Sequence, residues 1–312
     1  MSFSHLTNKT TAINFLSEHL MEGTITIFLG AGVSKDFGVP GWVDLLNDLN
    51  KSYLVEHEMG FKVADFVPRV SETSTAQDLQ VFADEIQADY GSEAALIEAI
   101  SKILYPNPST SSLNKKIFKN ELFLAIGAML TGSKRGHVRN IVTLNYDSMI
   151  ETYLSIIGYI PRIIYELPSL EGSEDVRIYH PHGFVPNPKN PKWNNSSFII
   201  LGLDSVSKRL GTIGDPWFEK VRHILRSSIC IFIGMSPRTF NDPAIRPLIN
   251  TVGEEIKTER PTGFWVLRNK LNKGESEAFL RNNIVPLEIT EPDGIPDFLL
   301  SICQEAANEM LD

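Results

Sequence analysis

Residues 25–34 read ITIFLGAGVS, and this stretch decides the fold. Its apolar, β-branched start is typical of a buried strand, and the Gly-Ala-Gly that follows predicts a tight turn into a helix. Gly30 and Gly32 can adopt backbone angles that other residues avoid, and they let a ligand approach the main chain. The N–H groups at the start of the next helix would then face an anion such as a phosphate. Many α/β proteins need such a turn only for packing, so the pattern alone leaves both interpretations open.

Further strand-like segments follow in the second half of the chain. They are residues 140–146, 161–167, 176–180, 197–202, 227–234, 263–269 and 283–289. Several are short apolar runs without alternation, which is typical of parallel strands covered on both faces. Helical patterns lie between some of them, for example at residues 149–158. We therefore expect an α/β protein with a doubly wound, mostly parallel, Rossmann-like sheet.

The region between the first two predicted strands is entirely helical in pattern. Its helices are expected within residues 79–91, 93–105 and 117–130. Such a block, lodged between two strands of one sheet, indicates a helical insertion. We expect a single domain over residues 1–312, with a Rossmann-like core from residues 20–50 and 138–312 and an insertion at 51–137.

Composition narrows the function. The net charge of −9 over 312 residues argues against binding nucleic acid or an anionic membrane through a broad charged surface, because both kinds of binding need clustered Lys and Arg. One short basic group, Lys134, Arg135, His137 and Arg139, is expected to form a solvated loop. The N-terminus lacks a signal-peptide pattern and no apolar run is long enough to span a membrane, so a cytoplasmic protein is expected.

The chain has two cysteines, which give no disulfide framework and no zinc-binding pair. Cys230 lies in the apolar run SSICIFIG and is expected to be a small buried hydrophobe, and Cys303 stands alone. We therefore expect no zinc module and no bound metal.

Three polar clusters come directly after predicted strands: TLNYD at residues 143–147, HPHG at 180–183 and GMS at 234–236. Each has a structural alternative. Asn145 and Asp147 could cap the next helix, one histidine could be a turn residue, and GMS could be a tight turn. The carboxyl ends of parallel strands, however, meet at one edge of the sheet. With the Gly-Ala-Gly turn, four such clusters together favour a binding site.

The order of GAGVS, TLNYD, HG and GMS resembles the sirtuin superfamily. The matching positions are residues 30–34, the Gly-Val-Pro at 38–40, residues 143–147 with Leu144 in place of Gln, His182–Gly183, and Gly234 with Ser236. The resemblance implies NAD as the ligand. It covers about residues 20–50 and 138–290 and leaves the helical insertion uncovered.

The resemblance also implies roles for individual residues. His182 would be the general base, Asn145 would orient the ribose and the attacking water, and Asp147 would face the nicotinamide amide. The remaining contacts to NAD would come from Gly30, Ala31, Gly32, Ser34, Gly234, Ser236 and Asn269. His180 competes with His182 for the role of base. The glycine after His182 fits the family pair, and Pro181 interrupts the strand alternation that would place both rings on one side.

Departures from the family pattern refine this interpretation. The four-cysteine zinc module of protein-deacylating sirtuins is missing, and so is the arginine that follows their Gly-Ile-Pro-Asp-Phe element. Residues 184–197 are too short and too polar to replace that module. These features resemble the bacterial sirtuin-like NAD hydrolases of anti-phage defence, which lack the zinc module and carry helical insertions.

The hypothesis is therefore an NAD⁺ glycohydrolase that cleaves the bond between nicotinamide and ribose, with NAD as its substrate, and that depletes NAD during defence. The same analogy implies a homo-oligomer and a regulatory or ATPase partner protein, with no direct contact to nucleic acid or membrane. The alternatives are an NAD-dependent protein deacylase and a non-catalytic module that senses NAD or ADP-ribose.

Overall fold

The structure is a computed structural model that describes residues 3–58, 61–106, 110–131, 137–169, 172, 174–190, 192–209, 213–241, 245–256, 260–292 and 294–309. Of the predicted basic loop, Lys134 and Arg135 lie outside these ranges. Arg139 is exposed and donates a hydrogen bond to the ring of His137 at 3.2 Å.

A seven-stranded sheet forms the centre of the described chain, in the order β3-β4-β2-β1-β5-β6-β7. The strands are β1 (Ile25–Leu29), β2 (Asn140–Thr143), β3 (Pro161–Ile164), β4 (Val176–Tyr179), β5 (Ile229–Ile233), β6 (Gly263–Leu267) and β7 (Ile284–Glu288). Every pairing is parallel, so the doubly wound, Rossmann-like α/β fold is confirmed. The chain builds the sheet outward in both directions from β1 and β5, and ligands bind beyond the strand ends at such a switch point.

Side chains of the central strands alternate between two hydrophobic cores. Ile25, Ile27 and Leu29 pack into one core, while Phe28 packs into the other with Phe232. Covering both faces explains why these strands read as continuous apolar runs.

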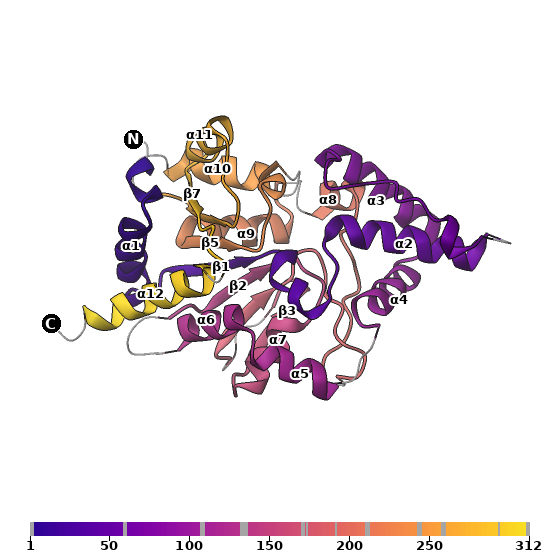
Figure 1. The fold of residues 1–312 in the computed structure, drawn as a ribbon, viewed down its shortest axis with the longest axis horizontal. Helices are drawn as coiled ribbons and strands as arrows, with labels where there is room; N and C mark the ends of the chain where they lie inside the picture. Colours follow the sequence, from indigo (N-terminus) through magenta and orange to yellow (C-terminus); the bar gives the residue numbers. More distant parts are fainter. Residues whose placement is uncertain are drawn as a thin grey trace.

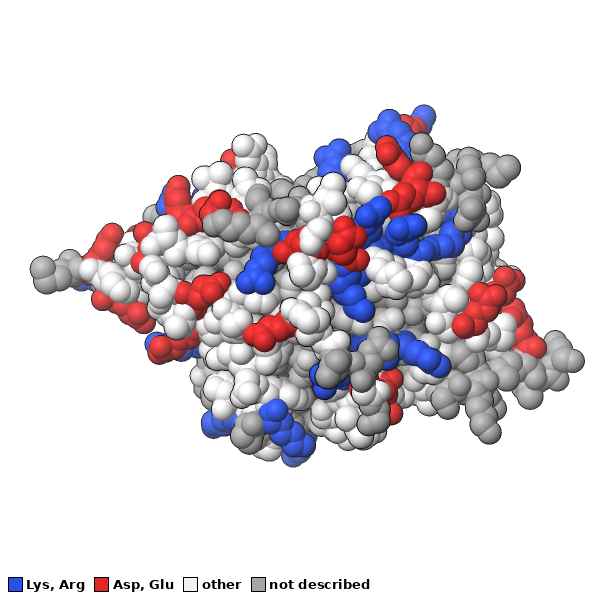
Figure 2. Space-filling model, turned by 180° about the vertical axis from the view of Figure 1, so that it is seen from behind, with Lys and Arg blue, Asp and Glu red and all other residues white. Residues whose placement is uncertain are grey.

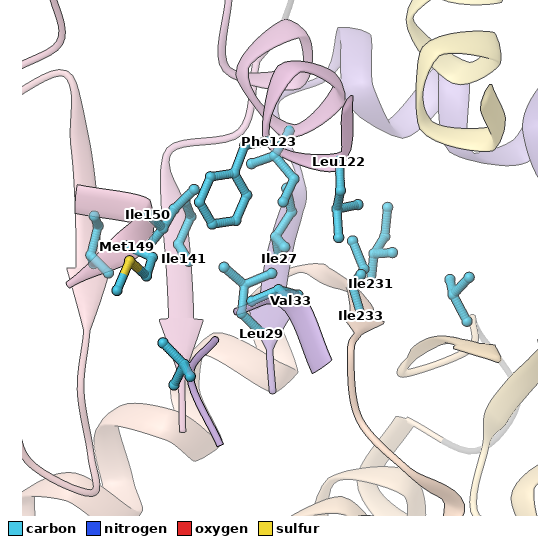
Figure 3. Close-up of a cluster of buried hydrophobic side chains, with 14 of the residues drawn as sticks. Ile27, Leu29, Val33, Leu122, Phe123, Ile141, Met149, Ile150, Ile231 and Ile233 are labelled. Carbon is cyan, nitrogen blue, oxygen red and sulfur yellow. The ribbon is translucent and has the colours of Figure 1, made fainter. Parts of the chain in front are cut away.

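Helices cover both faces of the sheet (Figure 1). The first core is covered by α1 (Lys9–Met21), α6 (Glu121–Leu130), α7 (Met149–Ile156) and α12 (Gly294–Asn308). The second core is covered by α9 (Pro216–Ser227), α10 (Arg246–Ile256) and α11 (Lys273–Arg281). Figure 3 shows Leu122 and Phe123 of α6 directed at the strands that carry Ile27 and Ile231, so the last helix of the predicted insertion also covers the sheet.

A group of helices, which we call the helical lobe, lies beyond the end of the sheet toward which β1 runs (Figure 1). It consists of α2 (Trp42–His57), α3 (Ala76–Tyr90), α4 (Glu93–Leu104) and α8 (Leu203–Arg209). Within it, α3 packs against the other three helices and also against the 3-10 turn Pro237–Asn241 that follows β5. The lobe therefore contacts the edge of the sheet where the polar clusters lie.

Two local predictions were wrong. Residues 117–130, predicted as one helix, form the end of α5 (Thr110–Phe118) and the whole of α6. The break occurs because Asn120 adopts an extended backbone and its side chain caps α6 by accepting a hydrogen bond from the N–H of Phe123 at 3.0 Å.

The second wrong prediction is a strand at residues 197–202. Residues 198–202 of this segment are buried, but its backbone bonds to a loop and not to a neighbouring strand. The N–H of Ile200 donates to the carbonyl of His182 at 2.9 Å, and Tyr146 donates its hydroxyl to the Ile200 carbonyl. Gly183, with a φ of +102°, permits this approach, because a Cβ there would lie 2.4 Å from the Phe198 carbonyl oxygen.

One face of the molecule mixes both signs of charge. On the face in Figure 2, Lys and Arg side chains are interspersed with Asp and Glu. In the described part of the chain, no helix combines the length and apolar character that crossing a membrane requires.

Candidate functional site

The turns after β1 and β5 are bound tightly to each other. Gly30 donates its N–H to the carbonyl of Ile233, and Gly32 donates to that of Gly234, both at 2.9 Å. A Cβ on Gly32 would lie 2.8 Å from the Gly234 oxygen, and Gly234 itself has a φ of +71°. The glycines thus allow close contact between two turns of the protein.

This arrangement differs from a phosphate cradle in which the first N–H groups of a helix are free. The N–H groups of Gly30 and Gly32 already have partners, and two 3-10 turns, Ala31–Val33 and Lys35–Phe37, precede α2. Ala31 is half-buried between the two glycines. Binding of a diphosphate by this turn remains a prediction, and it would need other donors or a small movement of the turn.

Asn145 links the end of β2 to the glycine turn. Its side-chain amide donates to the Gly30 carbonyl at 3.1 Å and to the Ser34 hydroxyl at 3.4 Å. Since a carbonyl can only accept, the amide nitrogen must face Gly30. The amide oxygen of Asn145 accepts no hydrogen bond from the described residues, which leaves it available to a ligand hydroxyl.

Asp147 is buried and forms the next link in this group. One carboxyl oxygen accepts from the Ser34 hydroxyl at 3.1 Å and from the N–H of Met149, the first residue of α7, at 3.0 Å. Burial is the main cause that raises the pKa of Asp147 to about 6, and nearby Glu151 adds to the rise. Helix capping, the structural alternative, is therefore real for Asp147, whereas Asn145 makes different contacts.

The two histidines after β4 have different surroundings. His180 is completely buried, and both of its ring nitrogens contact acceptors: Glu151 at 2.7 Å and the backbone oxygen of Asn145 at 3.1 Å. These partners hold the ring within the protein. His180 thus contacts the site through the backbone of Asn145.

The ring of His182 has fewer hydrogen-bond partners than that of His180. Its Nε2 atom is buried and has no hydrogen-bond partner in the described chain. Burial lowers the pKa of His182 to about 4, against the opposing effect of a hydrogen bond with the Leu144 backbone. The ring is therefore neutral near pH 7. A buried polar atom without a partner calls for an explanation, and a ligand atom would provide one.

Seven of the predicted site residues fall into two sets. Hydrogen bonds join Gly30, Ser34, Asn145 and Asp147 into one group, and Gly234 packs against it. Ser236 and Asn269 also follow strands, β5 and β6, but both are exposed and no hydrogen bond joins them to this group among the described residues. Their contacts to a ligand remain predictions.

Two buried residues next to this group were missed from the sequence. Glu151 lies on the buried face of α7, and a carboxylate among the apolar residues of MIETYLSI was the available signal. Tyr105, at the end of α4, accepts from the N–H of Ser148 and donates to the Val185 carbonyl, both at 2.9 Å. No spacing in the sequence connects Tyr105 with residues so far along the chain.

Neither cysteine contributes to the site. Cys230 is buried in β5, which confirms its prediction as a small buried hydrophobe, and burial raises the pKa of its thiol to about 12. Burial also raises the pKa of Cys303 to about 11. Among the described residues, no three His, Cys, Asp or Glu side chains are grouped as metal ligands would be.

Comparison with known proteins adds one finding. Residues 139–287 match the family model of the SIR2-like domain, and this region includes Asn145, Asp147, His182 and Gly234. Curated proteins gave no match. The matched region begins at β2, so it excludes the Gly-Ala-Gly turn. The SIR2-like match supports placing the chain in the sirtuin-like superfamily, with an NAD-related function.

Proposed function

We propose that the chain is an NAD⁺ glycohydrolase, which converts NAD and water into nicotinamide and ADP-ribose. The observation that carries the proposal is the buried, unpartnered Nε2 of His182, in a loop that bonds to the β2 turn through Leu144. A neutral imidazole nitrogen without a hydrogen-bond partner can accept a proton from water.

In the proposed reaction, the bond between the nicotinamide nitrogen and the ribose carbon breaks, and its electron pair leaves with nicotinamide. Water forms the new bond to that carbon and gives a proton to His182. The free oxygen of Asn145 would hold a ribose hydroxyl or the water in place. Ser34 and Asp147 support Asn145 from the opposite side.

The test is nicotinamide release from pure protein and NAD, with no acylated peptide present. Asn145→Ala and His182→Ala should each abolish release and keep the fold, because each removes one polar group at the site. His223→Ala is the matched control, since this histidine is exposed on α9.

Each other outcome identifies a different function. Release that requires an acyl-peptide would replace the proposal with a deacylase. Binding of NAD without turnover would replace it with a sensing module. Full activity in His182→Ala would refute the role of this residue as the base.

We further propose that this activity depletes NAD during anti-phage defence, and that assembly or a partner protein controls it. The resemblance to zinc-free bacterial NAD hydrolases supports this extension, and the helical lobe offers a surface for control because it contacts the β5 turn through α3. Specific activity should rise with protein concentration, measured together with the sedimentation coefficient. Constant specific activity across monomer and oligomer would rule out control by assembly.

A further inference from the structure

Glu151 and His180 form a buried polar pair that the proposed reaction does not use. Both side chains are fully buried, and Glu151 Oε1 lies 2.7 Å from His180 Nε2. The second oxygen of Glu151 is buried and has no partner in the described chain. Burying such a pair brings a desolvation cost that apolar residues would avoid, so stability alone gives it no reason to be there.

The hydrogen-bond geometry fixes how many protons the pair holds. His180 Nδ1 faces the backbone oxygen of Asn145 at 3.1 Å, and because this oxygen can only accept, Nδ1 carries a hydrogen. The contact between Nε2 and Glu151 then needs one more proton. That proton is either on the imidazole, facing a carboxylate, or on the carboxyl group, facing a neutral ring. The pair has no net charge in either form.

The pair is connected directly to Asn145. The backbone of Asn145 is held on both sides, by Thr143 Oγ1 accepting from its N–H at 3.1 Å and by His180 donating to its carbonyl. The ring of Phe184 meets His180 edge-on, with ring centroids 4.6 Å apart, and so limits rotation of the imidazole. Glu151 therefore fixes the ring, and the ring fixes the backbone that carries the Asn145 amide.

We propose that Glu151, acting through His180, is a positioning residue that holds Asn145 in the orientation needed to cleave NAD. This inference rests on the proposed function for its kinetic effect. The contact between the pair and Asn145 is independent of the proposed function.

Two variants of Glu151 separate positioning from general stability. Glu151→Gln keeps a hydrogen bond, because its amide N–H can donate to the Nε2 of a neutral His180. Glu151→Leu removes the bond with little change in volume. Leu154→Ala is the matched control, since Leu154 is fully buried on the same helix.

The measured quantities are KM and kcat, with kcat calculated per folded molecule. Glu151→Leu should lower kcat about 100-fold, as expected for a misplaced reacting group, with a smaller effect on KM. Glu151→Gln should stay close to wild type. Leu154→Ala should lower the melting temperature and leave kcat unchanged. A kcat in Glu151→Leu equal to that of Leu154→Ala would overturn the inference, as would a Gln variant as defective as the Leu variant.

A second readout does not depend on turnover. The side-chain amide resonance of Asn145, assigned by its loss in Asn145→Ala, should shift in Glu151→Leu and stay in place in Glu151→Gln and Leu154→Ala. An unmoved resonance in Glu151→Leu would overturn the inference. Wild-type protein that releases no nicotinamide would refute the proposed function, and this spectrum would still test the positioning.

Discussion

Burial shifts the pKa values of two residues of the candidate site in opposite directions. The pKa of Asp147 is raised to about 6, because its charged form is desolvated, and that of His182 is lowered to about 4 for the same reason. Burial therefore favours the neutral form of both groups. Near pH 7, His182 is neutral while Asp147 is mostly ionised.

These shifts predict opposite effects of pH on stability. A raised carboxyl pKa means that the folded state binds the proton more tightly, so the Asp147 contribution falls as pH rises from 3.8 to about 6. A shift of this size corresponds to about 3 kcal/mol. A lowered histidine pKa works the other way, and the His182 contribution falls as pH drops from 6.5 to about 4.

The measurement is the free energy of unfolding of each variant minus that of wild type, by urea titration from pH 4 to pH 7.5. For Asp147→Asn the difference should become more favourable as pH rises, and for His182→Asn it should become more favourable as pH falls. Taking differences cancels the titration of the other groups. Two differences that stay flat with pH would show that neither residue is desolvated as described.

At the scale of elements, the site depends on how closely the β1 and β5 turns approach. A methyl group on Gly32 would lie 2.8 Å from the Gly234 oxygen and 2.9 Å from its Cα, and both are backbone atoms that cannot turn aside. Gly32→Ala should therefore separate the turns. We expect a loss of about 1–3 kcal/mol in the free energy of unfolding, typical of overpacking, and a higher KM for NAD.

Gly41→Ala is the control for this prediction. Gly41 precedes α2 in the same loop, but a Cβ there would meet only the ends of two side chains, Lys35 at 3.4 Å and Asp44 at 3.8 Å. Its cost should be below about 1 kcal/mol. Equal stability and equal KM in the two variants would show that the close approach of the turns has no role in the site.

The sequence predicts elements well where a local pattern dictates the structure. The strands of the sheet follow from apolar runs, and α3, α4 and α7 follow from helical spacing. The prediction fails where tertiary contacts decide. Residues 197–202 have the composition of a strand, yet they bond to the loop at His182, and the break before α6 depends on one capping side chain, Asn120.

The candidate site is predictable to the same extent. Asn145, Asp147 and Ser34 could be singled out because each lies just beyond a strand end, and the structure brings them together. Glu151 and Tyr105 could not be assigned, because their link to these residues arises only from the packing of α7 and α4. The contact between the glycine turn and β5 likewise has no signature within either segment.

At the scale of the molecule, the helical lobe and the sheet share one hydrophobic core. Phe82 and Ile86 of α3 and Ile100 of α4 belong to the same buried cluster as Ile27 of β1. Asp84 of α3 also accepts a hydrogen bond from the N–H of Asp204 at 3.1 Å, which joins α3 to α8. A shared core makes the lobe and the sheet unfold together.

This arrangement predicts a single thermal transition for the lobe and the sheet. ADP-ribose, the product of the proposed reaction, should raise the midpoint of that one transition. At 100 times its dissociation constant, a ligand that binds only the folded state stabilises it by about 2.7 kcal/mol. Near-ultraviolet circular dichroism in the tryptophan band of a Trp42→Phe variant, which removes the tryptophan of the lobe and keeps the buried Trp217 and Trp265, reports on the sheet. This signal and the fluorescence of a label placed on the lobe at Val81→Cys should give the same midpoint as each other, both with and without ADP-ribose. Val81 is an exposed position of α3, so the label should leave the core intact. Two separate midpoints, of which only one rises with ADP-ribose, would mean that the lobe folds independently and that the site belongs to one part alone.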